Sequence, residues 1–515
     1  MKKVSFLSRA VPKSVLFIGA VLAACTSFLI YVLRINAVYV DTAVFNGFSA
    51  ILFGGNILCA VLLFALFLLQ AHHMEKGGAE VHTKKAFQIL AKIGLVFAGI
   101  FLLYTVCTMI FSDFEMRARL RTSIGASILP FAATISILLL VWGLPLIQKS
   151  ACKRGIAIVL TCVLALSAVL TLFPCYPYKF LSDPMVIDNG ESYSVVFATN
   201  DTGTGFAEYT YQGKAYKVYD EAAGRLKNST IHTVKIPKAH LNGNSYRVGS
   251  TRVIEERSYG GRSGKSLLSK DYAFTVPSSE QQTYLTVSDW HMHTKEAYKA
   301  IANVGEYDGV ILLGDAVPGL ECEKDIADYI VTFGGEVSHG VMPILYVRGN
   351  HETRGPFAAA LPEYLGMGSF FYTTDYGDYH FLLLDSGEDK QDSHPEYGGM
   401  VHYDAYRANM VDWLETQEKS DKKTITLVHD SDLCVEDDLR ARAEAKLGML
   451  GATEIISGHY HVCKFEQENG FNIYTDGGFH KNEYIASKLS LTKSNYRLSA
   501  WNDKGEQVFD KEIAW

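Results

Sequence analysis

The sequence predicts a multi-domain protein with three unlike parts: an α-helical transmembrane bundle of about five helices, a small β-sandwich and a larger α/β domain. Three observations lead to this fold class. Long apolar runs are concentrated in residues 1–178, short apolar runs separated by turns follow in 183–277, and apolar runs alternate with helical patterns in 283–515. The length of 515 residues agrees with this division, since a single domain usually has roughly 100–200 residues.

The first part contains five apolar stretches, each long enough for the roughly 20 residues that a transmembrane helix needs. They are Ser14–Leu33, Phe48–Leu69, Ile89–Phe111, Ile124–Ile147 and Gly155–Cys175. Apart from Lys92, which is near an end, these stretches contain no Asp, Glu, Lys or Arg. Because charges inside a membrane usually mark ion or substrate pathways, their absence favours an anchor over a transporter.

The basic residues between these stretches predict the orientation of the bundle. With the N-terminus inside, ten Lys and Arg residues lie on the cytoplasmic side and five on the other side. Positive residues mark the cytoplasmic side, so five spans place everything after Tyr178 outside. We therefore expect an integral, multi-pass protein of a bacterial cell membrane, with the lipid bilayer as a partner and the later domains on the extracytoplasmic side. The net charge of -7 provides no basic field for nucleic acid, and no nucleic-acid partner is expected.

The second part, residues 183–277, has the pattern of an all-β domain. Its short apolar runs are separated by turn-rich pieces such as 200–203 and 242–244, a spacing typical of a sandwich. The position of this part and the stretch from His232 to Tyr246 resemble the fibronectin-like N-terminal domain of purple acid phosphatases. The resemblance implies a fibronectin/Ig-like β-sandwich, for which the simplest role is that of a spacer before the next domain.

The third part, residues 283–515, places polar side chains directly after its predicted strands. Five apolar runs each end in a carboxylate, an imidazole or an amide, at 289–291, 315, 350–352, 429 and 459–461. Between the runs the pattern predicts helices at Thr294–Val304, Lys324–Phe333, Tyr403–Glu415 and Glu436–Leu447. Ligand groups in α/β folds gather beyond the carboxyl ends of the strands. Oxygen and imidazole donors together suit Mn, Fe or Zn, so the sequence predicts a metal centre there.

These motifs, Asp-x-His, Gly-Asp, Gly-Asn-His-Glu, His and Gly-His-x-His, resemble in type and order those of the calcineurin-like metallophosphoesterase superfamily. The resemblance covers Thr283 to Gly478 and implies an α/β domain in which helices flank a β-sandwich. Carried over residue by residue, it implies seven metal ligands. Asp289, His291 and His461 would hold one ion, Asn350, His429 and His459 would hold the other, and Asp315 would bridge them.

The same resemblance implies the chemistry. Two divalent or trivalent ions of Mn, Fe or Zn, about 3.5–4 Å apart, clamp a phosphoryl oxygen and supply a bridging hydroxide that attacks phosphorus in line. His351 would stay free of metal and stabilise or protonate the leaving oxygen, with Glu352 orienting it. The predicted function is hydrolysis of phosphate mono- or diesters. A non-catalytic membrane receptor or scaffold that keeps a metal-binding phosphoesterase fold is the alternative.

Several neighbouring residues leave questions open. Pro318 stands where purple acid phosphatases have the tyrosine that binds Fe(III), so a coloured tyrosinate centre is not expected. Arg354 either meets a substrate phosphate through its planar fork or is an ordinary surface residue. His293 either points the same way as His291 and reaches substrate or, as we expect, faces solvent from a loop. Tyr460 is expected to turn away from the metals and pack. The carboxylates at 430 and 432 either repel a phosphate or contact a cationic group of the substrate.

Overall fold

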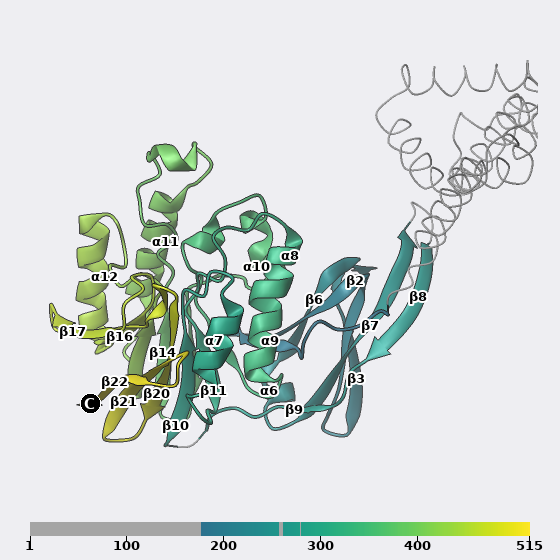
Figure 1. The fold of residues 1–515 in the computed structure, drawn as a ribbon, viewed down its shortest axis with the longest axis horizontal. Coiled ribbons are helices and arrows are strands. Elements are labelled where there is room, and N and C mark those ends of the chain that lie inside the picture. Colours follow the sequence, from purple (N-terminus) through teal and green to yellow (C-terminus); the bar gives the residue numbers. More distant parts are fainter. Residues whose placement is uncertain (1–176, 257–260, 279) are drawn as a thin grey trace, which may run out of the picture. The chain divides into compact units, whose positions relative to one another are not determined.

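The computed structural model of the chain describes residues 177–515, apart from 257–260 and 279 (Figure 1). Within these residues, Tyr178–Glu255 and Arg262–Trp515 form one compact unit. No helix in this part of the chain is both long enough and apolar enough to cross a membrane. This finding corrects the prediction of a transmembrane fold class, of a multi-pass membrane protein and of the lipid bilayer as a partner. The five stretches that were predicted to span lie outside the described residues.

A large β-sheet runs through the whole described unit. It has 14 strands, ten of them in the order β22-β21-β20-β10-β11-β12-β1-β2-β7-β8, while β19, β3, β6 and β9 pair to the side of this path. Along the path the strands are β22 (Gln507–Ala514), β21 (Asn495–Asn502), β20 (Glu483–Leu491), β10 (Gln282–Val287), β11 (Gly309–Leu312), β12 (Ile344–Tyr346), β1 (Met185–Asp188), β2 (Ser192–Tyr211), β7 (Ser245–Glu256) and β8 (Gly261–Leu268). The side strands are β19 (Gly478–His480), β3 (Lys214–Tyr219), β6 (Ser229–Pro237) and β9 (Tyr272–Ala273).

The strands β10, β11 and β12 form the parallel centre of this sheet. Their registers pair Thr286 with Ile311 and Ile311 with Leu345, and every residue of β11 and β12 is buried. Parallel strands buried on both faces have near-continuous apolar sequences, which is why these runs could be predicted. Helices α7 (Thr294–Ile301) and α9 (Thr332–Ser338) pack on this sheet and contribute to its core (Figure 1).

A second sheet of six strands faces the first. Its order is β13-β14-β15-β16-β18-β17, with β14, β15, β16 and β18 parallel to one another. The strands are β13 (Tyr372–Tyr376), β14 (Tyr379–Leu383), β15 (Lys423–Leu427), β16 (Glu454–Ser457), β18 (Phe471–Thr475) and β17 (Lys464–Glu468). Tyr284 of the first sheet contacts Phe381 of the second edge to face, with ring centroids 5.2 Å apart. The two sheets therefore share one apolar core.

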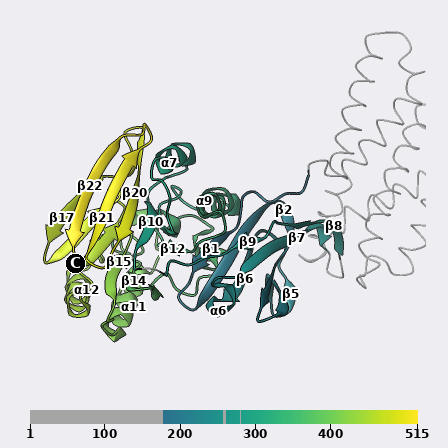
Figure 2. The same ribbon diagram turned by 90° about the horizontal axis from the view of Figure 1, so that it is seen from below.

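Helices α11 (Tyr403–Thr416) and α12 (Asp437–Leu450) lie side by side and pack on the second sheet (Figure 2). Their buried side chains, such as Val411 and Leu447, form an apolar cluster with Leu382 and Ile455 of the strands. Both helices confirm the helical patterns in the sequence to within three residues at each end. Two sheets with helices on their outer faces give the expected α/β domain.

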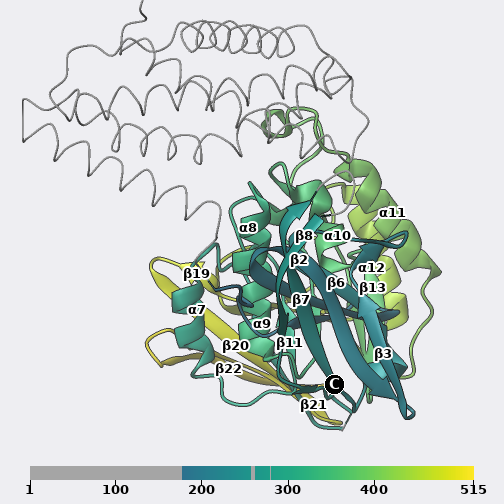
Figure 3. The same ribbon diagram turned by 90° about the vertical axis from the view of Figure 1, so that its right-hand side faces the viewer.

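Residues 183–277 are not a small separate sandwich, and the predicted fold class is corrected on this point as well. Strand β1 pairs with β12 through Ile187 and Ile344 and with β2 through Val186 and Val195, so the large sheet continues into this segment without a break. Strands β2, β6 and β7 then extend it side by side (Figure 3). A local pattern of alternating residues predicts a strand but does not reveal its partner, which explains the error. The boundaries at 183–277 and 283–515 stay a prediction.

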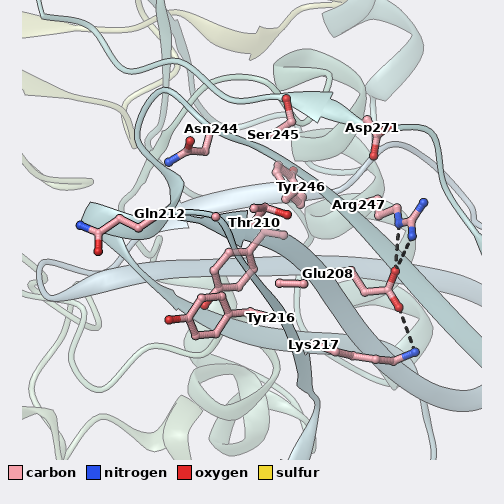
Figure 4. Close-up of a pocket in the computed structure, with 13 residues that line it drawn as sticks. Glu208, Thr210, Gln212, Tyr216, Lys217, Asn244, Ser245, Tyr246, Arg247 and Asp271 are labelled. Carbon is pink, nitrogen blue, oxygen red and sulfur yellow. Dashed lines mark hydrogen bonds and ion pairs between the residues drawn. The ribbon is translucent and has the colours of Figure 1, made fainter.

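A concave region of about 750 Å³ lies on β2, β3 and β7 of this segment (Figure 4). Three of its charged side chains pair with one another: Glu208 accepts from Arg247 at 2.9 Å and pairs with Lys217 at 3.0 Å. These two cations hold the pKa of the Glu208 carboxyl below its usual value. None of the residues predicted to bind metal lines this region. The chemistry is therefore expected elsewhere, at the strand ends between the two sheets.

Candidate metal centre

The strand ends bring the predicted site residues together. The first sheet contributes Asp289 and His291 after β10, Asp315 after β11 and Asn350 and His351 after β12, while the second contributes His429 after β15 and His459 and His461 after β16. The His and Asp residues fall into three overlapping groups whose ligand atoms lie within 4.8 Å of one another. These groups are Asp289, His291 and His461; His291, Asp315 and His351; and Asp315, His429 and His459.

The backbone at these strand ends turns sharply. Five of the proposed ligands, which are not glycine, have left-handed φ angles between 36° and 70°: Asp289, His291, Asp315, His459 and His461. Such a conformation costs a side-chain-bearing residue about 1–3 kcal/mol. The rest of the fold must therefore hold these turns in place, and the strain is concentrated where the donors converge.

Asp289 supplies a carboxylate oxygen without a hydrogen bond. The residue is fully buried, its Oδ2 accepts from the His459 backbone N–H at 2.9 Å, and its Oδ1 has no hydrogen-bond partner in the described residues. His461 donates from Nδ1 to the Phe479 carbonyl at 2.7 Å, which leaves the lone pair of its Nε2 3.5 Å from that Oδ1. A buried negative oxygen that faces an imidazole lone pair requires a positive charge between them, and a metal ion fits this requirement.

His429 forms the matching half of the centre. Its Nδ1 donates to the Leu313 carbonyl at 2.6 Å, so its Nε2 faces Asn350 Oδ1 at 3.1 Å and Asp315 Oδ2 at 3.3 Å. Burial alone would lower the pKa of His429, but the Asp315 carboxylate raises it above its ordinary value. The space between His429 Nε2 and Asp315 Oδ2 therefore attracts a cation. That cation is either a proton on Nε2 or a metal ion bound to it.

The Asn350 carboxamide has two orientations with different partners. In one, its oxygen faces His429 Nε2 at 3.1 Å and His459 Nδ1 at 3.3 Å. In the other, its NH₂ group donates to these two nitrogens and its oxygen accepts from Arg354 Nη2 at 3.0 Å. A metal ion beside the histidines selects the first orientation, because only the oxygen can ligate.

Asp315 lies at the centre of the arrangement. Its Oδ2 is 3.3 Å from His429 Nε2, 3.7 Å from His291 Nε2 and 3.8 Å from His351 Nε2. Burial would raise the pKa of the Asp315 carboxyl, yet His429 and the other histidines hold it below its usual value. An ionised carboxylate reached from both groups of donors fits the bridging position that the family pattern implies.

Glu352 does not orient His351, in contrast to the expectation from the sequence. It is fully buried and accepts from the backbone N–H groups of Asp315 at 2.9 Å, Ala316 at 2.5 Å and Gly349 at 2.8 Å. Burial and the nearby Asp315 raise the pKa of the Glu352 carboxyl to about 7. This side chain therefore fastens the turn after β11 to the turn after β12.

His351 lies at the rim of the centre and is oriented by a carbonyl. Its Nδ1 donates to Pro318 at 2.9 Å, so its Nε2 points toward Asp315, and its ring meets that of His291 edge to face at 4.8 Å. The side chain is 27% exposed, which leaves Nε2 within reach of a bound substrate.

Two neighbours lie differently from the expectation. Tyr460 is 41% exposed and its hydroxyl donates to Asp430 at 3.1 Å, so it is not packed in the interior. His293 stacks on Phe479 with ring centroids 3.5 Å apart, so it does not simply face solvent. Glu388 binds Arg354 at the rim of the centre, although the two residues are 34 positions apart. No sequence pattern predicts this contact.

Two facing sheets with converging Asp, Asn and His donors at their strand ends define the class of metal-dependent phosphoester hydrolases. In agreement, residues 283–463 match the family model described as calcineurin-like phosphoesterase. The chain thus contains a calcineurin-like phosphoesterase domain and is a phosphoester hydrolase. The family binds divalent metals, and the donors described above are candidate ligands. The match does not reach residues 183–277, so it does not support a likeness of that segment to purple acid phosphatases.

Several solved structures are similar to part of the chain. GAP50, the anchor in the inner membrane complex of Plasmodium, is 12% identical over 45% of this chain and 89% of its own, with a TM-score of 0.34. A predicted phosphoesterase from Streptococcus pneumoniae TIGR4 is 14% identical over 46% and 98%, with a TM-score of 0.24. Vacuolar Protein Sorting 29 from Cryptosporidium parvum is 10% identical over 46% and 99%, with a TM-score of 0.26. At these values the likenesses add no argument about function. No curated protein matches the chain.

Proposed function

We propose that the chain hydrolyses phosphate mono- or diesters at a centre of two Mn, Fe or Zn ions in the divalent or trivalent state. The proposed ligands are Asp289, His291, Asp315, Asn350, His429, His459 and His461. The observation that carries this proposal is the convergence of buried carboxylate oxygens and imidazole Nε2 atoms, an arrangement that needs a cation between them. Asp289 Oδ1 has no hydrogen bond among residues 177–515 as far as these are described, and the Nε2 atoms of His461 and His429 both point at carboxylate oxygens.

When bound, such ions supply Lewis acidity at phosphorus and a nucleophilic water near neutral pH. The chain itself fixes the donors before substrate arrives, because carbonyl groups orient both His429 and His461 through Nδ1. His351 is oriented in the same way but stays at the rim. Its Nε2 would face the leaving oxygen, and general acid catalysis from such a position is worth roughly 10²–10⁴-fold in rate.

The test uses the purified full chain loaded with Mn²⁺ or Zn²⁺ and a panel of nitrophenyl mono- and diesters, nucleotides and phospholipids. Asp289→Asn and His429→Ala are expected to lower kcat/KM by at least about 10³-fold, since each removes a donor from the centre. His402→Ala is the matched control, because the His402 side chain is 88% exposed and should leave activity unchanged.

Metal analysis tests metal binding separately from catalysis. About two ions per chain are expected in the wild type, and each substitution is expected to lower this number. Full activity in His429→Ala would contradict the assigned site. Bound metal with no turnover of any ester would instead favour a metal-binding protein without catalysis.

A further inference from the structure

Arg354 lies beside the proposed metal centre and is held by a buried carboxylate. Its Nε and Nη2 donate to the two carboxylate oxygens of Glu388, each at 2.9 Å. Glu388 is 1% exposed and also accepts from the hydroxyls of Thr353 at 2.7 Å and Tyr397 at 3.0 Å. A bidentate pair with a carboxylate that is itself fixed on two further sides determines the plane of the guanidinium group.

The other edge of this guanidinium faces the centre. Nη1 is 3.4 Å from His351 Nε2. Nη2 is 3.0 Å from the outer atom of the Asn350 carboxamide, which is the NH₂ group in the metal-binding orientation and so does not accept from Arg354. Asp389 approaches Nη2 from the loop side, at 3.6 Å. Glu388 binds the edge of the guanidinium that carries Nε and Nη2. The end of the group that carries Nη1 and the second N–H of Nη2 therefore faces the proposed ligands, where a substrate phosphate would bind.

We propose that Arg354 donates to a non-bridging oxygen of the substrate phosphate, that Glu388 positions it for this contact, and that the pair makes the site selective for monoesters. This inference rests on the proposed function. A monoester phosphate has three non-bridging oxygens, whereas a diester has two. If each ion holds one non-bridging oxygen, a third remains for Arg354 only in a monoester. The planar fork of arginine matches the spacing of phosphate oxygens.

The pair of Arg354 and Glu388 behaves as a fixed dipole more than as a free cation. A guanidinium that is already oriented by its carboxylate loses little side-chain freedom when the phosphate binds. It also adds little net charge to the site, because the carboxylate balances it. The contribution to binding should therefore depend on geometry, so that lysine at this position would restore it only in part.

The test compares Arg354→Ala and Arg354→Lys with the wild-type full chain in Mn²⁺, using nitrophenyl phosphate and bis(nitrophenyl) phosphate. For Arg354→Ala we expect the KM of the monoester to rise roughly 10- to 100-fold, as for the loss of one charge-assisted hydrogen bond, and the KM of the diester to change less than about 3-fold. The inhibition constant of inorganic phosphate should rise with the monoester KM. The number of bound metal ions should stay unchanged.

Glu388→Gln tests the positioning role. It removes the charge that orients Arg354 but leaves the guanidinium in the chain, so the monoester KM is expected to rise less, by about 3- to 10-fold. In Arg354→Ala the further change Glu388→Gln should have almost no effect on this KM, because the two residues act through one contact. Additive effects of the two substitutions would overturn the positioning role.

Arg442 provides the matched control. It makes the same bidentate pair with Glu415, at 2.9 and 2.8 Å, but on α12, away from the proposed ligands. Arg442→Ala should leave every KM unchanged. Loss of metal from Arg354→Ala would show that Arg354 acts through Asn350 and would overturn the phosphate contact. Equal increases in the KM of the monoester and of the diester would overturn the proposed selectivity for monoesters.

A binding experiment tests the contact between Arg354 and phosphate independently of hydrolysis. Calorimetric binding of inorganic phosphate to the metal-loaded chain needs no turnover, so it measures the Arg354 contact even in an inactive protein. Weaker phosphate binding by Arg354→Ala supports the contact in that case as well. Unchanged phosphate binding would overturn it.

Discussion

At the scale of single residues, His232 is a buried histidine that the fold keeps neutral. It is fully buried on β6, with its Nε2 3.2 Å from the Ser250 hydroxyl and 3.4 Å from that of Thr199. Its Nδ1 has no hydrogen bond within the described residues and is 4.0 Å from Asp220. Burial lowers the pKa of His232 to about 3. The folded protein thus excludes the proton that a free histidine would take up.

The consequence is a loss of stability in acid. The unfolded histidine has a pKa near 6.5, so between about pH 6.5 and 3 the unfolded state binds more protons than the folded state. Stability is complete above pH 6.5 and falls as the pH falls below it. From pH 7 to pH 5 this residue alone should cost about 2 kcal/mol of the free energy of unfolding.

His232→Gln is expected to reduce the difference in unfolding free energy between pH 7 and pH 5 by that amount, whatever it does to stability at pH 7. Urea unfolding at the two pH values measures it. His402→Gln, at an exposed position, should leave the difference unchanged. If the wild type and His232→Gln lost the same unfolding free energy between pH 7 and pH 5, His232 would not be the cause of the acid sensitivity.

The sequence predicts individual residues well where a motif fixes their chemistry and poorly where only a tertiary contact does. The proposed ligands lie in motifs at strand ends, so their convergence follows from strand order. Glu352 has the same motif context, yet its side chain turns to the backbone of two neighbouring loops. The carboxylate that holds Arg354 comes from a loop without any motif, and no local pattern could reveal it.

At the scale of secondary-structure elements, the turns after β11 and β12 touch each other. Gly314 has φ +86°, and a Cβ atom at this position would lie 2.2 Å from the backbone nitrogen of Gly349. Both the left-handed conformation and the contact between two backbones therefore require glycine. Asp315 and Asn350 follow these glycines directly, so the spacing of the two turns also sets the spacing of two proposed ligands.

Gly314→Ala should therefore damage the metal centre as well as the fold. We expect a loss of roughly 3 kcal/mol in unfolding free energy, from backbone strain and overpacking together, and at least about 10-fold weaker Mn²⁺ binding. Urea unfolding and calorimetric titration with Mn²⁺ are the measurements. Gly305→Ala is the control, because Gly305 has φ +79° but open space around its Cβ position. It should cost only about 1 kcal/mol and leave Mn²⁺ binding intact.

Among elements, the buried parallel strands and the long helices were predictable, whereas the extension of the sheet was not. The runs of β11 and β12 are apolar on both faces because both faces are covered. Strands β20, β21 and β22 have mixed exposure, and β22 is largely exposed, so their sequences lack a continuous apolar run. These three strands pair with their neighbours in sequence, and their place at one end of the large sheet follows from the long-range pairing of β20 with β10 (Figure 2).

At the scale of the whole molecule, one buried carboxylate joins three separate elements. Asp188 of β1 accepts from the hydroxyls of Thr374, at 2.8 Å, and Tyr376 on β13, and it pairs with Lys238 of α6 (Lys238–Leu241) at 2.8 Å. It is fully buried. This network links the strands before residue 277 to the second sheet of the phosphoesterase domain.

Asp188→Ala is expected to lower the free energy of unfolding by about 3–5 kcal/mol, because it leaves two buried hydroxyls without their acceptor and Lys238 without its counter-charge. We also expect one cooperative transition, in which near-ultraviolet circular dichroism and phosphoesterase activity are lost together in urea. Asp183→Ala should cost less, roughly 1–2 kcal/mol, since the Asp183 side chain is partly exposed, pairs with an exposed lysine and accepts from one hydroxyl, that of Tyr272. Two well-separated transitions in the wild type would show that residues 178–277 fold independently.

The position of β10 in the sheet determines when the protein can fold during its synthesis. β10 lies between β11 and β20, and its Tyr284 is opposite Leu489. The ribosome makes these two residues about 200 positions apart, so the strand that precedes Asp289 stays unpaired on one edge until nearly the entire chain has emerged. An exposed edge of this kind invites pairing with other chains. Nascent chains of this protein therefore keep this edge exposed for longer than a domain built from local contacts would.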